Sequence, residues 1–162
     1  MIQRTLVLIK PDGVQRSLVG KILSRFEDAG LKIVGMKMKW VDDEFAAKHY
    51  FDIKERHGER IYNNLAEYLK EGPVIAMVLE GVNVISIVRK MVGATYPDEA
   101  APGTIRGDFA HISKDYANAM DKKVGNLIHA SSNEKDAEYE VNLWFAPEEL
   151  HSYKTVHDVH VI

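Results

Sequence analysis

Four short apolar runs, separated by segments with helical periodicity, constrain the fold more than any other feature of this chain. They span residues 5–10, 31–40, 73–81 and 126–131. Each run has the length of a strand and is bounded by turn-forming or polar residues. The sequence therefore predicts four strands.

The segments between these runs have the spacing of amphipathic helices. Val19, Ile22, Leu23 and Phe26 lie at i, i+3, i+4 and i+7, which predicts a helix that ends near Gly30. Further helices are expected at residues 43–51, 61–69, 84–92 and 134–145. The first two of these flank the charged stretch 54–60, and Ser131 with Glu134 has the pattern of a capping box for the last.

This order of elements favours an α+β fold, a ferredoxin-like βαββαβ sandwich with a four-stranded antiparallel sheet and helices on its faces. A doubly wound parallel sheet is the competing interpretation. There is no internal repeat and no linker, so residues 1–162 are predicted to form a single domain. Residues 93–123 lack periodicity, and so long an irregular segment in a compact domain is usually functional.

Composition narrows the cellular setting and the partners. The net charge of -3 gives no overall basic field, so nucleic acid is not expected as the main partner. The absence of cysteine excludes disulfides and thiol nucleophiles and is typical of a reducing cytoplasm. The apolar runs are too short for a signal peptide or a membrane span. We therefore expect a cytoplasmic protein with no membrane partner.

A histidine and a carboxylate occupy positions where a folded core would favour apolar residues. Glu140 shares a helical face with Ala137, Val141 and Trp144, so its charge would point toward the core, which is costly unless it is paired. His129 ends the fourth apolar run and is close enough along the chain to meet it. Alternatively, Glu140 lies at the edge of the stripe and reaches solvent. His129 itself is open to three interpretations: a structural hydrogen-bonder, a metal ligand or a nucleophile.

Three cations lie at loops and element ends. Lys10 closes the first strand, where lysines are usually solvated, and Arg89 beside its helical stripe either extends to solvent or faces a cleft. Arg106 lies in a glycine-flanked loop that is expected to be mobile. Together they suit a polyphosphate site. His157 and His160 lack an obvious third ligand, so no metal held by the protein itself is expected.

Several motifs together resemble the nucleoside diphosphate kinases. They are IKPDGVQR at residues 9–16, GPV at 72–74, PGTIRGDF at 102–109 and NLIHAS at 126–131, and the match runs from about Arg4 to Tyr153. The resemblance implies ping-pong transfer of a γ-phosphoryl group from a nucleoside triphosphate to an active-site histidine, and then to a nucleoside diphosphate. Mg²⁺ is implied as a cofactor bound with the nucleotide phosphates.

The resemblance also implies roles for individual residues. His129 matches the phosphorylated histidine, Glu140 and Ser131 match the groups that support it, and Tyr50 matches a ring lying against it. The matched phosphate-binding positions are Lys10, Arg89, Thr95 and Arg106. Asn126 matches the residue that, with Lys10, holds the sugar 3'-hydroxyl. Asp12 is interpreted as structural, fixing the turn after the first strand.

Two departures from the family pattern concern the nucleotide base and one segment. Members usually stack the base on a phenylalanine, but Ile61 stands at that position, so either Tyr62 rotates in or the base is held by apolar contact alone. Whether Arg56 or Arg60 matches a further phosphate-contacting arginine stays open. Residues 110–123 form a longer segment than in bacterial and animal members, similar to the archaeal ones.

Assembly and an alternative function complete the expectations. Family members are mostly hexamers, with some tetramers. The resemblance therefore implies a homo-oligomer, and we expect the commoner state, a hexamer. The tail at residues 147–162 is expected to wrap the surface or to contact another subunit. The alternative is a catalytically inactive ferredoxin-like module that binds nucleotide or RNA. It would need aromatic residues on an open sheet face and a basic stripe, and neither is evident in the strands.

Overall fold

The computed structural model describes residues 1–160 and contains one four-stranded sheet. The strands are β1 (Ile2–Ile9), β2 (Lys32–Lys39), β3 (Val74–Val82) and β4 (Ile128–Ala130), in the order β2-β3-β1-β4. All three pairings are antiparallel. The predicted ferredoxin-like α+β fold is confirmed, and the doubly wound parallel alternative is wrong.

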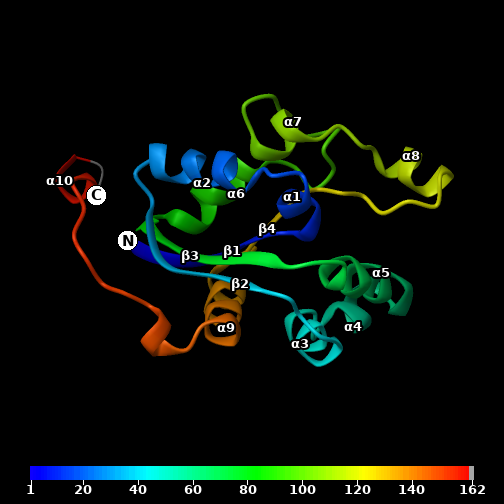
Figure 1. The fold of residues 1–162 in the computed structure, drawn as a ribbon, viewed down its shortest axis with the longest axis horizontal. Helices are drawn as coiled ribbons and strands as arrows, with labels where there is room; N and C mark the ends of the chain where they lie inside the picture. The colour runs from blue at the N-terminus through cyan, green and yellow to red at the C-terminus, as the bar shows by residue number, and fades with distance from the viewer. Residues whose placement is uncertain (161–162) are drawn as a thin grey trace.

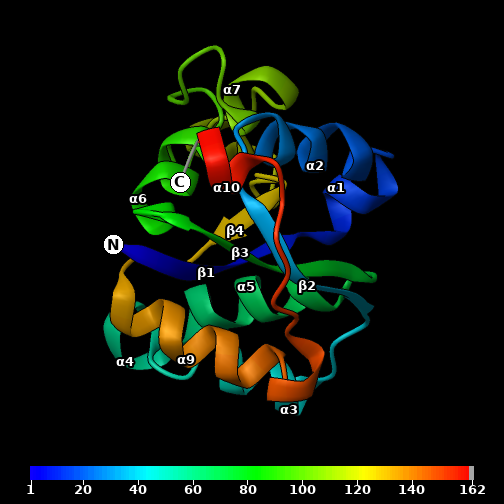
Figure 2. The ribbon, with the colours of Figure 1, turned by 90° about the vertical axis from the view of Figure 1, so that its left-hand side faces the viewer.

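Helices cover both faces of this sheet (Figures 1 and 2). On one face lie α1 (Pro11–Gln15), α2 (Val19–Asp28), α6 (Val84–Val92) and α7 (Ile105–Phe109). On the other lie α3 (Asp43–His49), α4 (Ile53–His57), α5 (Glu59–Lys70) and α9 (Glu134–Trp144). The remaining elements are α8 (Lys114–Ala119), the 3-10 turn η1 (Pro147–Glu149) and α10 (His157–His160).

Two apolar cores result from the alternation of side chains along the central strand β1. Val7 and Ile9 pack into the core under α2 and α6, whereas Leu6 and Leu8 pack into the core against α5 and α9. All four side chains are fully buried. Because successive strand residues face opposite ways, a strand covered on both faces has the continuous apolar run seen in the sequence.

Three segments differ from the sequence-based expectations. The turn predicted after the first strand is the short helix α1, with Pro11 at its first position. The charged stretch 54–60 is helical except at Gly58, whose φ of 89° ends α4 and separates it from α5. Residues 93–123 contain α7 and α8, each capped by a hydroxyl side chain. These helices are too short for periodicity to reveal them.

The start of α9 corrects the predicted capping box. Asn133 is the N-cap, and its Oδ1 accepts a hydrogen bond from the Asp136 amide at 2.9 Å. Ser131 lies before the cap and is fully buried, with its hydroxyl turned into the protein. The Ser131 side chain is therefore available to the site described below.

The tail lies along the surface of its own chain, which is one of the two arrangements expected from the sequence. The His151 amide donates to the carbonyl of Val34 at 2.7 Å, and the Tyr153 hydroxyl donates to the carbonyl of Ile33 at 2.5 Å. These contacts fix the tail along β2. Within residues 1–160, no helix combines the length and the apolar character needed to cross a membrane.

Candidate active site

His129 projects from the short strand β4 toward α9. It pairs with Leu8 of β1, and it therefore faces the same side of the sheet as Leu8, while Ile128 and Ala130 pack into the opposite core. Its side chain keeps 22% of its surface exposed. The imidazole is thus fixed by a central strand pairing and is still accessible from outside.

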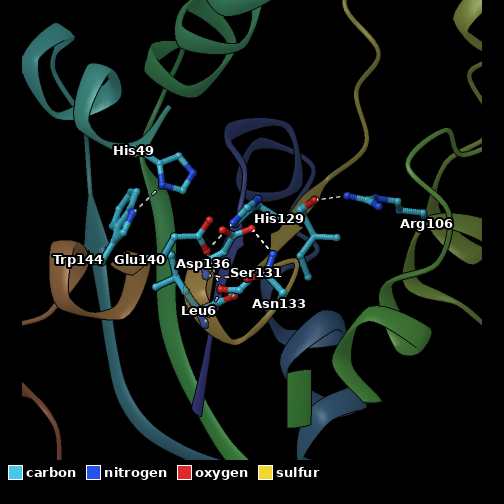
Figure 3. Close-up of polar contacts among 10 residues, drawn as sticks. Leu6, His49, Arg106, His129, Ser131, Asn133, Asp136, Glu140 and Trp144 are labelled. Atoms are coloured by element: carbon cyan, nitrogen blue, oxygen red, sulfur yellow. Dashed lines mark hydrogen bonds and ion pairs between the residues drawn. The ribbon is translucent and has the colours of Figure 1, made fainter. Parts of the chain in front are cut away.

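Glu140 meets this imidazole from α9 (Figure 3). Its carboxylate Oε2 lies 3.0 Å from His129 Nε2 and accepts a second hydrogen bond, of 2.5 Å, from the Ser131 hydroxyl. The Ser131 Oγ in turn accepts from the Leu6 amide at 3.2 Å. The prediction that Glu140 faces inward and is paired is confirmed, and the alternative that it reaches solvent is wrong.

The charge of Glu140 fixes the tautomer of His129. Burial alone would raise the pKa of this carboxyl group, but the facing His129 and the hydrogen bonds from His129 and Ser131 bring the pKa below its usual range. An ionised carboxylate only accepts hydrogen bonds, so the neutral imidazole carries its hydrogen on Nε2. The lone pair is then on Nδ1.

A cavity of about 320 Å³ opens beside His129. Of the ten residues predicted for the site, all but Ser131 and Ile61 line it. Its walls hold the predicted phosphate- and sugar-binding groups together with one further arginine: Lys10, Arg56, Arg89, Thr95, Arg106 and Asn126. Residues from six separate parts of the chain therefore line one cavity, as expected for a single polyphosphate site.

Lys10 lies at the floor of this cavity and not in bulk solvent. Its Nζ donates to Asn126 Oδ1 at 2.7 Å, and Asn126 Nδ2 donates to the carbonyl of Thr95 at 3.0 Å. Burial, followed by the nearby Arg106 cation, lowers the pKa of Lys10 to about 7, with Asp12 acting in the opposite direction. The amine therefore gains stability as a cation when an anion enters the cavity.

Arg106 is held rigidly, which corrects the expectation of a mobile loop. It belongs to α7, is 9% exposed, and donates to four backbone carbonyls, those of Gly93, Ala94, Asn126 and Ile128, at 2.6 to 3.2 Å. Figure 3 shows its guanidinium beside β4. Burial and the neighbouring Arg89 lower its pKa to about 10, so it stays charged at neutral pH.

The arginines at the mouth of the cavity are exposed. Arg89 stands at the end of α6, and Arg56 donates to Asp52 at 2.9 Å one helical turn away. Arg60 does not line this cavity but a shallower hollow that it shares with Ile61. Of the two arginines left open by the sequence, Arg56 is the one placed to contact a ligand beside His129.

The two residues considered for contact with the base, Ile61 and Tyr62, do not line the main cavity. Ile61 is 45% exposed on α5 and faces the shallower hollow. Tyr62 packs against the core, with Lys54 Nζ at 4.4 Å from its ring centroid. Apolar and aromatic residues that the sequence did not single out line the main cavity instead: Phe51, Ile53, His57 and Leu65. Ile61 as a base contact stays a prediction.

Asp12 and Tyr50 have supporting positions. Asp12 Oδ2 accepts from the Leu127 amide at 3.2 Å, so this carboxylate ties α1 to the segment entering β4. Tyr50 is buried at the end of α3 and lines the cavity. Burial and the charge of Glu140 raise the pKa of its hydroxyl, which therefore stays protonated at neutral pH.

Fold and site together define a class of protein. A tautomer-fixed imidazole beside four cationic side chains, on a ferredoxin-like α+β domain, is suited to phosphoryl transfer through a histidine.

Comparison with known proteins gives the family. The family model described as nucleoside diphosphate kinase matches residues 3–150. The nucleoside diphosphate kinase of Borreliella burgdorferi is 48% identical over 156 residues, covering 95% of this chain and 93% of that protein. The enzyme of Pyrococcus furiosus is 50% identical over 152 residues, covering 94% and 88% respectively. The chain belongs to the nucleoside diphosphate kinase family.

A solved structure agrees with this assignment. The structure of the Borrelia burgdorferi nucleoside-diphosphate kinase with bound vanadate and ADP, described as a transition-state mimic, superposes on this chain with a TM-score of 0.93 at 47% identity. The match covers 97% of this chain and 95% of that one. Sequence and fold therefore agree over nearly the whole length.

Proposed function

We propose that this chain transfers the γ-phosphoryl group of a nucleoside triphosphate to a nucleoside diphosphate through a phosphohistidine at His129. The observation that carries the proposal is the 3.0 Å contact between His129 Nε2 and Glu140, because it leaves Nδ1 as the nucleophilic nitrogen. The vanadate and ADP bound to the Borrelia relative support the same substrate class, since vanadate stands in for a transferring phosphoryl group.

The reaction proceeds in two balanced steps. In the first, the Nδ1 lone pair attacks the γ-phosphorus, the bond to the β-phosphate oxygen breaks, and the nucleoside diphosphate leaves with that electron pair. The ring then carries positive charge, which the Glu140 carboxylate stabilises through Nε2–H. In the second step a terminal oxygen of another nucleoside diphosphate attacks the phosphorus, and the P–N bond breaks to restore the lone pair.

The cations divide the work of binding phosphate. Lys10 and Arg106 are buried and held by hydrogen bonds, so they form a preorganised floor. Arg106 is already charged at neutral pH, and Lys10 gains its charge as bound phosphate raises its pKa. Arg56 and Arg89 are exposed and can follow different phosphate positions. Lys10 and Asn126 present an amine and an amide side by side, which supports their predicted contact with the sugar 3'-hydroxyl.

The three carboxylates of the cavity are already paired, which fits Mg²⁺ that arrives bound to the nucleotide. Asp52 is paired with Arg56, Asp136 accepts from Asn133 at 2.9 Å, and Glu140 is held by His129 and Ser131. Because each carboxylate is already engaged, we propose that the nucleotide phosphates supply the main ligands, as Mg²⁺ commonly prefers. When bound, the ion neutralises charge on the β- and γ-phosphates.

We further propose that the protein acts in the cytoplasm as a homo-oligomer, with the hexamer as the expected state. Met36 and Met38 on the edge strand β2, and Trp40 just after it, are 54%, 60% and 67% exposed. Such an apolar stripe on a sheet edge is suited to contact with a second copy. Light scattering on the purified protein measures the mass of the assembly directly.

The alternative of an inactive RNA-binding module has less support. Recognition of single-stranded RNA on a sheet needs an exposed sheet face for base stacking. Here helices cover both faces (Figure 2), and one cavity is lined by the cations that suit a ligand site, Lys10, Arg56, Arg89 and Arg106.

Labelling with γ-labelled ATP tests the proposal. The protein is expected to acquire acid-labile, base-stable label that GDP, CDP and UDP all discharge. His129→Gln is expected to acquire none. Equal labelling of His129→Gln and the unaltered chain would overturn the assignment.

A further inference from the structure

His49 is a second histidine at the site, and in the part of the chain that the structure describes only one of its ring nitrogens has a hydrogen-bond partner. It ends α3, is 5% exposed, and its Nδ1 accepts a hydrogen bond of 3.1 Å from the Trp144 indole Nε1–H. Its Nε2 is buried and has no hydrogen-bond partner within residues 1–160. A buried polar group without a partner is costly and needs an explanation.

The contact with Trp144 fixes the tautomer of His49. An indole nitrogen only donates, so Nδ1 must carry the lone pair and Nε2 must carry the hydrogen of the neutral ring. Burial, and then the nearby His129, lower the pKa of His49 to about 3, with opposition from Glu140 and a further lowering by Lys10. His49 is therefore a neutral N–H donor at all ordinary working pH values.

The ring of His49 meets the ring of His129 nearly at a right angle. Their centroids are 5.0 Å apart with an interplanar angle of 82°. Figure 3 shows His49 between Trp144 and the pair formed by His129 and Glu140. On another side the Tyr50 ring packs against His49 at 4.7 Å. Both the position and the orientation of His49 are thus fixed by aromatic neighbours.

A metal site is the competing interpretation of this cluster. One potential ligand atom from each of His49, His129 and Glu140 lies within 4.8 Å of the others. A metal bound at His49 Nε2 would need a lone pair there, with the hydrogen on Nδ1 facing the indole hydrogen of Trp144. In that arrangement two N–H groups, those of His49 Nδ1 and Trp144 Nε1, would point at each other. The contact with Trp144 therefore favours a hydrogen on His49 Nε2 over a lone pair that binds a metal.

We propose that His49 is a positioning residue, whose neutral Nε2–H faces the His129–Glu140 pair and keeps the nucleophilic ring in the orientation that exposes Nδ1. A cation at this place would compete with His129 for the Glu140 carboxylate, whereas a neutral donor restricts rotation of the ring without that competition. The inference rests on the proposed role of His129 as nucleophile.

Two substitutions separate the donor from the packing. In His49→Asn the amide oxygen can replace Nδ1 as the acceptor for Trp144, but no donor reaches the place of Nε2. In His49→Gln the amide nitrogen can take the place of Nε2–H. The measurement is the single-turnover rate of His129 phosphorylation by γ-labelled ATP, across a range of ATP concentrations.

The expected result is a split between rate and affinity. His49→Asn should lose roughly tenfold or more in the maximal rate, the size typical of groups that orient an imidazole, with half-saturation changed less than about twofold. His49→Gln should recover a large part of the rate. A wild-type rate in His49→Asn, or equal losses in both variants, would overturn the proposal.

Nitrogen NMR of the unaltered protein covers the case in which the variants do not fold. The ¹⁵N shifts of His49 should show a hydrogen on Nε2 and a lone pair on Nδ1, and the opposite tautomer would overturn the proposal. Absence of phosphohistidine in the unaltered protein would instead refute the function proposed for His129, so the two failures are distinguishable.

Discussion

Glu140 Oε2 lies 3.0 Å from His129 Nε2, although the two residues belong to different elements, α9 and β4. The turn between these elements also supplies Ser131, which donates to the same carboxylate oxygen at 2.5 Å. One short stretch of chain thus builds the nucleophile, its charged partner and the hydroxyl that holds that partner.

Removal of the charge at position 140 should slow phosphorylation. Glu140→Gln keeps the shape of the side chain but not the charge that balances the phosphorylated ring, so we expect a rate roughly 10- to 100-fold lower. Single-turnover labelling measures the rate. Glu138→Gln, on an exposed position of the same helix, is the matched control. An unchanged rate in Glu140→Gln would contradict the proposed role.

Ser131 should matter for stability as well as for the site. Ser131→Ala leaves the buried Leu6 amide without its side-chain acceptor and Glu140 without a donor, which should cost roughly 1–3 kcal/mol of unfolding free energy. Urea denaturation should show a lower midpoint at an unchanged slope. Ser132→Ala, at the exposed neighbouring position, should behave like the unaltered chain. Equal midpoints for the two variants would refute this account.

Arg89 and Arg106 should separate binding from folding. Arg106→Ala removes the donor to four carbonyls and should lower the unfolding free energy by more than about 3 kcal/mol. Arg89→Ala, at an exposed site, should change it by less than about 0.5 kcal/mol while raising KM for ATP. Thermal unfolding and steady-state kinetics give both quantities. Similar destabilisation by the two substitutions would show that Arg106 is not the structural anchor.

Nucleotide binding should be accompanied by proton uptake at pH 8. The pKa of Lys10 is about 7 in the free protein, so at pH 8 the amine is mostly neutral. Bound phosphate favours the charged form and raises this pKa, so the complex holds more protons than its separate parts, and affinity falls as pH rises through 7 to 8. Calorimetry in buffers of different ionisation enthalpy measures the uptake. Lys10→Arg should take up fewer protons, and equal uptake would assign the proton to another group.

The sequence was most informative where a single element determines the structure. The apolar runs predicted the four strands, and the position of Glu140 on an apolar stripe gave an inward-facing, paired carboxylate as one of two arrangements. Local patterns failed where distant contacts decide. Arg106 looked mobile beside its glycines, yet carbonyls from β4 and from the end of α6 hold it. The sequence assigned no role to His49, because its tautomer depends on Trp144 from another helix.

The most direct test of the central claim is to identify which nitrogen of His129 carries the phosphate. The protein, labelled with ¹⁵N in its histidines, is phosphorylated with ATP and examined by ³¹P and ¹⁵N NMR. Because Glu140 occupies Nε2, phosphate is predicted on Nδ1, with a hydrogen retained on Nε2. Phosphate on Nε2 would require this contact to break and would contradict the account.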